Sequence, residues 1–301
     1  MTITASACAK TILFGEHAVV YGEPAIAVPL VNTRTTAELL PNQGSFLVTS
    51  DQVGLNSTFD ELPEGSGIQH LLLGVMEEFG LSELPPMSLK IRSDIPIASG
   101  LGSGAALSAA VIRAFARCFD RELTTERINR MVYEIEKIYH GTPSGVDNTV
   151  IVYEQPVLFT KSSGFSPLDA DLSRFPLLVA DSGIRSRTVE VVSDVRSHFD
   201  RNERYIREIG SLVREAETAL TAGDLSETGR LMNENQKLLE KIDVSCPELD
   251  ELIALAMENG ACGAKLTGAG RGGNFIVLCK DTLHAISLKT LYEKRGVHVI
   301  L

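Results

Sequence analysis

The stretch "DIPIASGLGSGAALSAA", residues 94–110, places three glycines within five residues, from Gly100 to Gly104, directly before an alanine-rich apolar run. That run predicts a buried helix over 103–119, and the alternating "MSLKIRS" at 87–93 predicts a strand in front of it. The first amide groups of a helix are unpaired and carry a partial positive charge. Glycines let an anion approach them closely, so strand, glycine loop and helix together favour a phosphate-binding loop.

The glycine pattern itself fits neither of the common nucleotide motifs. It lacks the Lys-Ser/Thr ending of a Walker A loop and the spacing of a dinucleotide fingerprint. A tight turn before a close-packed helix is therefore the alternative to a phosphate loop.

A second dense polar segment, "EKIYHGTPSGVDN" at residues 136–148, follows a helix predicted over 124–139. Gly141 and Pro143 end that helix. Glu136 lies one turn before the helix end and is a suitable magnesium ligand beside bound phosphates. Asp147 is suited to accept or orient the proton of a substrate hydroxyl. The alternative is a capped turn in which Asp147 forms a structural salt bridge.

The N-terminal segment "AKTILFGEHAVVYGEPAIAV", residues 9–28, adds three more polar candidates. Lys10 is placed to pair with Asp147 or to neutralise charge on a transferred phosphoryl group. His17, next to Glu16, either hydrogen-bonds an acceptor substrate or is a structural residue of the turn.

Composition limits the classes of function. The chain has 301 residues, a net charge of −11 and 22% charged residues, which fits a globular protein and disfavours nucleic acid or an anionic membrane as partner. The five cysteines form no close pair and indicate a reduced, intracellular protein without disulfides or zinc: Cys8, Cys118, Cys246, Cys262 and Cys279. We expect no signal peptide and no membrane-spanning segment.

Helices and strands are expected in both halves, which predicts an α/β or α+β protein of two domains with a boundary in the loop 161–175. Further helices are expected at 68–79, 187–221, 224–241 and 247–259. Further strands are expected in the N-terminal 60 residues, at 149–154, 156–160 and 176–183, on both sides of a glycine turn within 261–280, and at 297–301.

Four segments together resemble the GHMP kinase superfamily, and within it most closely the mevalonate kinases. They are "KTILFGEHAVVYG" (10–22), "PIASGLGSGAA" (96–106), "HGTPSGVDN" (140–148) and "KLTGAGRGG" (265–273), with "MNENQKLL" (232–239) as a further match. The resemblance covers nearly the whole chain. It implies a two-domain α+β fold, with an N-terminal ribosomal-S5-like domain at 1–172, a C-terminal ferredoxin-like domain at 173–301 and an active site in the cleft between them.

The resemblance also implies roles for individual residues. Asp147 and Lys10 would be catalytic, and Glu136 and Ser103 would bind Mg²⁺. The phosphates of ATP would be held by Pro96, Ser99, Gly100, Leu101, Gly102, Ser103, Gly104, Ala105 and Ala106. The substrate would be lined by Glu16, His17, Gly141, Ser144 and Thr188.

The sequence departs from the family pattern at three places. Gly104 stands where a second serine usually binds magnesium, so Ser103 or a water replaces it, or metal binding is weaker. Cys8 and Ala9 replace a Pro-Gly pair before the lysine, a change expected to affect only the local strand backbone. Arg271 interrupts the third glycine motif; its side chain either lies in solvent or reaches a phosphate or the acceptor's carboxylate.

The function implied is ATP-dependent phosphorylation of (R)-mevalonate to 5-phosphomevalonate in the isoprenoid pathway, by a cytoplasmic homodimer. The alternatives are a sibling enzyme, namely a phosphomevalonate kinase, a mevalonate 3-kinase or a related decarboxylase, and a sugar kinase. A non-catalytic metabolite-binding regulator is the alternative from another class; Gly104 is the feature that supports it.

Overall fold

The computed structural model describes residues 1–96, 99–140 and 143–300. The chain divides into two compact units. The first consists of Met1–Ala9, Leu30–Ile97 and Gly102–Glu154, and the second of Lys10–Pro29, Ala98–Leu101 and Gln155–Leu301. Strands β1 (Ile3–Phe14) and β2 (Ala25–Pro41) run from one unit into the other. Each unit is therefore built from segments that are not continuous in the sequence. The domain boundary expected after residue 172 stays a prediction.

The sheet of the first unit is built on the second half of β2. This half pairs antiparallel with β5 (Met87–Ser93), with Thr35 opposite Ser93. Strand β3 (Leu47–Ser50) runs parallel to β5, and β4 (Leu55–Thr58) pairs antiparallel with β3. Buried and half-exposed residues alternate along this half of β2, as expected for a strand with one face on the core.

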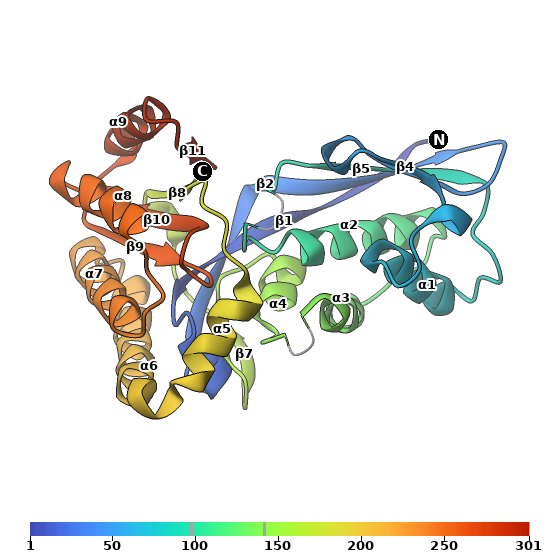
Figure 1. The fold of residues 1–301 in the computed structure, drawn as a ribbon. Helices are drawn as coiled ribbons and strands as arrows, with labels where there is room; N and C mark the ends of the chain where they lie inside the picture. Colours follow the sequence, from blue (N-terminus) through green and yellow to red (C-terminus); the bar gives the residue numbers. More distant parts are fainter. Residues whose placement is uncertain (97–98, 141–142, 301) are drawn as a thin grey trace. The chain divides into compact units, whose positions relative to one another are not determined.

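Helices α1 to α4 lie on one side of these strands (Figure 1). Their bounds are Gly67–Phe79, Ser103–Cys118, Thr125–His140 and Val146–Tyr153. Helices α2, α3 and α4 pack against one another. In the core the ring of Phe115, on α2, lies 6.0 Å from Phe46 and 6.4 Å from Phe79 between centroids. Thr124 Oγ1 accepts a hydrogen bond of 3.2 Å from the Arg127 amide and so caps the start of α3.

One predicted strand is wrong. Residues 149–154 were expected to be extended because Thr149, Val150, Ile151 and Val152 are all β-branched, yet they lie in α4. These four side chains are at most 3% exposed. Burial on all sides against the neighbouring helices outweighs their strand propensity, and Gly145 with φ 93° allows the sharp entry into the helix.

The second unit contains a four-stranded antiparallel sheet with the order β11-β8-β10-β9. The strands are β8 (Leu177–Asp181), β9 (Gly263–Thr267), β10 (Asn274–Leu278) and β11 (His298–Val299). Helices α7 (Leu225–Lys241), α8 (Pro247–Glu258) and α9 (Thr282–Glu293) contact this sheet, and α6 (Phe199–Ala222) packs on α7. The first half of β2 pairs with β6 (Val157–Thr160), which pairs with β7 (Gly164–Pro167).

The single helix expected over 187–221 is two helices, α5 (Thr188–Ser197) and α6. His198 separates them with a non-helical backbone, φ −110° and ψ 24°. Its ring Nδ1 lies 3.0 Å from the carbonyl oxygen of Asp194, in the last turn of α5. The described residues also include short 3₁₀ turns at Ala18–Tyr21, Asp51–Val53, Phe59–Glu61 and Leu172–Arg174. Over the described ranges no helix is both long and apolar enough to cross a membrane.

Candidate active site

The phosphate loop leads into the start of α2 in the first unit. Gly102, with φ 77°, is the N-cap of this helix, and Gly100 is also in the left-handed region with φ 79°. No side chain of the described residues caps this end, and its first turn holds no acidic residue. The buried Ala105 and Ala106 anchor the helix behind it. The first amide groups of α2 are thus available to an anion.

Glu136 lies beside this helix start. Its side chain is only 3% exposed, and a Cβ built on Gly104 would lie 3.0 Å from its Oε1. The half-buried Ser103 is the first residue of α2. No group of three or more His, Cys, Asp or Glu side chains suited to a metal occurs in the described part of the chain. One carboxylate beside a phosphate loop fits Mg²⁺, which keeps waters and substrate phosphates as its other ligands.

Asp147 lies in the first turn of α4, where the positive end of the helix favours an ionised carboxylate. The side chain is half-buried. Ser144 shapes the entry to this helix, because its Oγ accepts a hydrogen bond of 3.3 Å from the Val146 amide. Gly141, predicted to contact substrate, lies outside the described residues. Since α2, α3 and α4 pack together, the first unit carries Ser103, Glu136 and Asp147 on three contiguous helices.

Lys10 and the beginning of the glycine loop belong to the second unit. The amide of Lys10 donates a hydrogen bond of 3.0 Å to the carbonyl of Leu101, and its side chain is 3% exposed. The carbonyl of Ser99 accepts a hydrogen bond from the Asn274 side chain at the start of β10. These contacts bring together Lys10, Ser99 and Leu101, and they fix the loop backbone between β1 and β10. Pro96, also predicted to contact ATP, is half-buried in the first unit.

Glu16 forms an ion pair with Lys265, and both side chains are fully buried. The Lys265 ammonium also donates a hydrogen bond of 2.7 Å to the Leu266 carbonyl. Burial raises the pKa of Glu16 and lowers the pKa of Lys265, and each partner opposes the shift of the other. Oε2 of Glu16 has no hydrogen-bond partner among the described residues. The pair joins the "GEHAVVYG" segment to the "KLTGAGRGG" segment.

His17 is a buried, neutral side chain. Its Nε2 lies 2.8 Å from the Ala269 carbonyl oxygen. A carbonyl only accepts, so Nε2 carries the proton and Nδ1 is an acceptor. Burial is the main cause that lowers the pKa of His17 to about 4; the bond to Ala269 opposes this shift and the nearby Arg271 contributes to it. Nδ1 has no partner within the described part of the chain.

The Arg271 side chain forms an ion pair rather than lying free in solvent, and its contact with a phosphate or with the acceptor's carboxylate stays a prediction. Its Nη2 pairs with Asp194 Oδ2 at 2.5 Å, and its Nε donates to the Asp243 carbonyl at 2.9 Å. The Arg271 side chain is 35% exposed and its backbone is left-handed, with φ 53°. Arg271 thus ties the glycine turn to α5, the helix whose first residue is the exposed Thr188.

Sequence reasoning missed three residues that hold these segments. Lys265 and Asn274 have the partners given above, and Thr267 Oγ1 donates to the Ile12 carbonyl at 2.9 Å. Each is a polar residue within a strand whose positions are all buried. A polar residue in such an apolar strand is the signal that could have identified them, because buried polar groups require partners.

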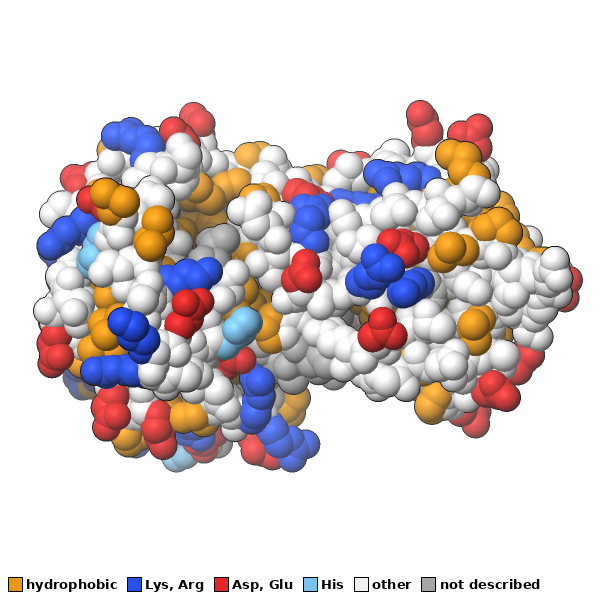
Figure 2. Space-filling model, turned by 90° about the horizontal axis from the view of Figure 1, so that it is seen from above, with side chains coloured by type: hydrophobic (Ala, Val, Ile, Leu, Met, Phe, Trp, Pro, Cys, Tyr) orange, Lys and Arg blue, Asp and Glu red, His pale blue; other side chains and the backbone are white. Residues whose placement is uncertain are grey.

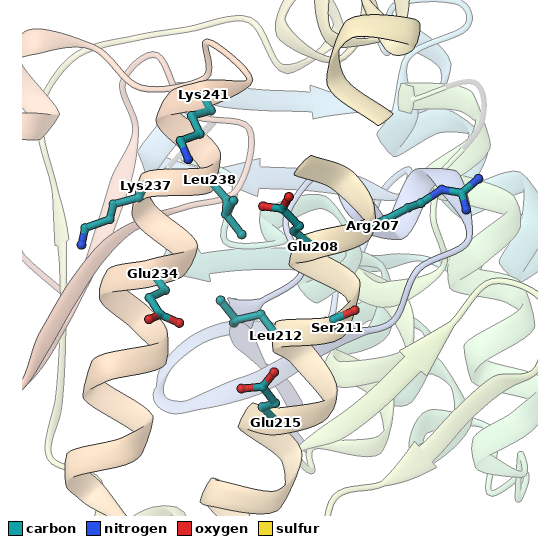
Figure 3. Close-up of a pocket in the computed structure, with 9 residues that line it drawn as sticks. All are labelled: Arg207, Glu208, Ser211, Leu212, Glu215, Glu234, Lys237, Leu238 and Lys241. Atoms are coloured by element: carbon teal, nitrogen blue, oxygen red, sulfur yellow. The ribbon is translucent and has the colours of Figure 1, made fainter. Parts of the chain in front are cut away.

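A cavity of about 490 Å³ lies between α6 and α7, and its lining contains none of the predicted site residues. Glu208, Glu215 and Glu234 line it together with Arg207, Lys237 and Lys241. In Figure 3 the side chains of Leu212 and Leu238 point into the space between the helices, while Arg207 and Lys237 point away. The three acidic and three basic side chains of the cavity balance in charge. Acidic and basic side chains are also interspersed over the face drawn in Figure 2. This cavity has no preference for an anionic substrate.

Comparisons with known proteins identify the family of the chain. The model of the GHMP kinases N terminal domain matches residues 66–155, and the GHMP kinases C terminal model matches residues 216–292. The mevalonate kinase of Thermococcus sibiricus is 33% identical over 306 residues, 93% of this chain and 90% of the relative. That of Pyrococcus abyssi is 35% identical over 295 residues, 90% and 87% of the two chains.

Solved structures extend the comparison to the fold. The Methanococcus jannaschii mevalonate kinase superposes with a TM-score of 0.87 at 26% identity, covering 99% of this chain and 96% of that one. The L. major mevalonate kinase, in complex with R-mevalonate, gives 0.83 at 31% identity, with 97% and 91% covered. The chain therefore resembles mevalonate kinases in sequence and in fold over nearly its whole length. It belongs to the mevalonate kinase family of the GHMP kinases.

Proposed function

We propose that this protein transfers the γ-phosphoryl group of ATP to the 5-hydroxyl of (R)-mevalonate, giving 5-phosphomevalonate and ADP. The observation that carries the proposal is the glycine-capped start of α2 with the buried Glu136 beside it, in a chain similar throughout to mevalonate kinases. In this proposal the amides from Gly100 to Ala106 hold the phosphates of ATP.

Glu136 would hold Mg²⁺, together with the Ser103 hydroxyl or a water. The space at Gly104 supports this assignment, because it leaves room beside the carboxylate for a ligand that is not a side chain. When bound, Mg²⁺ neutralises charge on the phosphate oxygens.

Asp147 would orient the substrate hydroxyl and accept its proton as the oxygen attacks the γ-phosphorus. The new oxygen–phosphorus bond forms, the bond to the β-phosphate oxygen breaks, and ADP leaves with that electron pair. The positive charge of Lys10 would stabilise the charge that develops on the transferred group. Positioning and charge neutralisation supply most of the rate in phosphoryl transfer.

The substrate side would use the unpartnered Nδ1 of His17, a neutral acceptor suited to a substrate hydroxyl. Glu16, Gly141, Ser144 and Thr188 complete this side. The L. major relative has been crystallised with R-mevalonate, which supports the choice of acceptor. We also expect a cytoplasmic homodimer.

An ADP-release assay with ATP and magnesium tests the function. The acceptors are mevalonate, 5-phosphomevalonate, 5-diphosphomevalonate, galactose and homoserine, and phosphorus NMR gives the position of the product. Selective formation of mevalonate 5-phosphate is expected. Selective turnover of another acceptor would instead identify a sibling enzyme.

Asp147→Asn separates an enzyme from a regulator. We expect its turnover to fall about 10²–10⁴-fold while ATP still binds. If the wild-type chain binds ATP and mevalonate but turns over none of the five acceptors, the regulator becomes the better conclusion, with Gly104 as its structural basis.

A further inference from the structure

A second cavity, of about 440 Å³, lies entirely within the first unit and contains none of the residues assigned to catalysis. It is formed by the first residues of β1, the middle of β2, the last turns of α2 and the residue that ends α4. Its lining is Thr4, Ala5, Ser6, Arg34, Thr36, Arg113, Arg117 and Glu154.

The lining carries an excess of positive charge in an acidic protein. Three guanidinium groups face one carboxylate, Glu154, whereas the whole chain has a net charge of −11. Arg113 and Arg117 are four residues apart on α2 and therefore project from the same side of the helix. No other acidic residue lines the cavity.

The contacts of Glu154 show how this cavity holds an anion. Its Oε1 lies 2.9 Å from Arg34 Nη2 and 2.6 Å from Arg113 Nη1. Arg113 is further fixed by the Ser6 and Val152 carbonyls, each 2.8 Å away. Two guanidinium groups are thus oriented in advance by a carboxylate and by backbone, which lowers the entropy cost of binding a further anion.

Arg117 is the arginine whose charge is not matched. Its side chain is exposed, and its hydrogen bond goes to the neutral Thr4 carbonyl. It forms no ion pair with a carboxylate of the described residues. Ser6 Oγ accepts a hydrogen bond of 3.0 Å from Arg34 Nε, which leaves the Ser6 hydroxyl proton available to donate.

We propose that this cavity is a binding site for a small phosphate-bearing anion, separate from the ATP loop. A phosphoryl group presents oxygens in several directions and accepts from more than one guanidinium fork at once, with Arg117 as its main ion-pair partner. The hydroxyls of Ser6 and Thr36 add donors. The volume falls within the usual range for small-molecule sites.

Calorimetric titration of inorganic pyrophosphate into the full chain tests the proposal. The protein is first saturated with magnesium and a non-hydrolysable ATP analogue. The heat of magnesium chelation by pyrophosphate, measured without protein, is subtracted, so that the heat that remains reports a site outside the phosphate loop. The variants are Arg117→Gln and Thr36→Leu, which remove a donor without touching the contacts of Glu154. Arg130→Gln is the matched control, because Arg130 is an exposed arginine of α3 that does not line the cavity.

We expect one pyrophosphate site in the presence of the analogue, weakened about tenfold by Arg117→Gln and severalfold by Thr36→Leu, and unchanged in Arg130→Gln. Its affinity should fall as salt is added. The proposal is overturned if the analogue abolishes pyrophosphate binding, or if both cavity variants bind as the wild type does while their circular dichroism shows an intact fold. In that case the arginines serve only to fasten β1 to α2 and α4.

Discussion

Removing the ammonium group from the buried Glu16–Lys265 pair should destabilise the protein strongly. Lys265→Met leaves the Glu16 carboxylate in a site where neither side chain has any exposed surface. Breaking one partner of such a pair costs about 3–5 kcal/mol, because the remaining charge is buried without compensation. The Leu266 carbonyl also loses a donor. We therefore expect a loss of about 3–5 kcal/mol from the free energy of unfolding.

The loss should depend on pH in a direction that identifies its cause. In Lys265→Met burial raises the pKa of Glu16 and no ammonium opposes the shift, so the folded chain holds the Glu16 proton more tightly than the unfolded chain does. The unfolded chain releases that proton above its ordinary pKa of 4.5. Folding then binds a proton, so the variant should become more stable as the pH falls from about 8 to about 5.

A double-mutant cycle completes the test. Glu16→Met with Lys265→Met replaces both charges by apolar side chains of similar length, and such replacements of buried pairs are often neutral or stabilising. Urea unfolding followed by far-ultraviolet circular dichroism suits this chain, which contains no tryptophan. The reasoning is refuted if Lys265→Met costs less than about 1 kcal/mol, or if the double variant loses the sum of the two single losses.

Three further predictions concern individual site residues. The pKa of His17 is lowered to about 4 from 6.5, so the unfolded chain binds a proton first as the pH falls. The wild type should therefore lose about 3 kcal/mol of stability between pH 6.5 and pH 4. His17→Gln should flatten this part of a plot of the urea midpoint against pH. Gly104→Ser places a hydroxyl beside Glu136 and should lower, severalfold, the Mg²⁺ concentration for half-maximal activity; an equal or higher concentration would contradict the magnesium assignment. Arg271→Gly removes the Asp194 pair but relieves a positive φ, so stability should change by no more than about 1 kcal/mol and KM for ATP and mevalonate by less than about twofold; a tenfold rise in either KM would show contact with substrate.

Most of the secondary structure could be predicted from the sequence, because the spacing of the apolar residues and the positions of glycine and proline indicated the same helix and strand limits. The predicted helices 68–79 and 124–139 match α1 and α3 within two residues, and the strand–turn–strand segment matches β9 and β10. Residues 149–154 failed because a short β-branched run has the same pattern in a buried helix as in a strand. The break at His198 failed because no glycine or proline marks it.

The candidate site was predictable at the level of motifs, and less so at the level of partners. Glycine spacing and a following apolar helix indicated the phosphate loop. The pairing of Glu16 with Lys265 joins residues 249 positions apart, and local sequence contains no information on such a contact. The same holds for Arg271, whose partners are Asp194 on α5 and Asp243 in the turn after α7.

Within the second unit, hydrogen-bonding capacity separates residues that hold the fold from residues open to a ligand. The Lys265 ammonium donates hydrogen bonds to the Glu16 carboxylate and to the Leu266 carbonyl. Lys265, although it belongs to a family motif, therefore has a structural role. His17 uses one nitrogen on Ala269 and leaves the other, buried, without a partner. Glu16 divides in the same way, with Oε1 paired and Oε2 unpartnered. A buried acceptor without a partner costs stability, so its presence in a motif favours a role that is completed only when substrate binds. We therefore expect His17→Gln to raise the KM for mevalonate more than a double replacement of Thr11 and Thr267 does. The hydroxyls of these two threonines already form a hydrogen bond of 3.0 Å with each other.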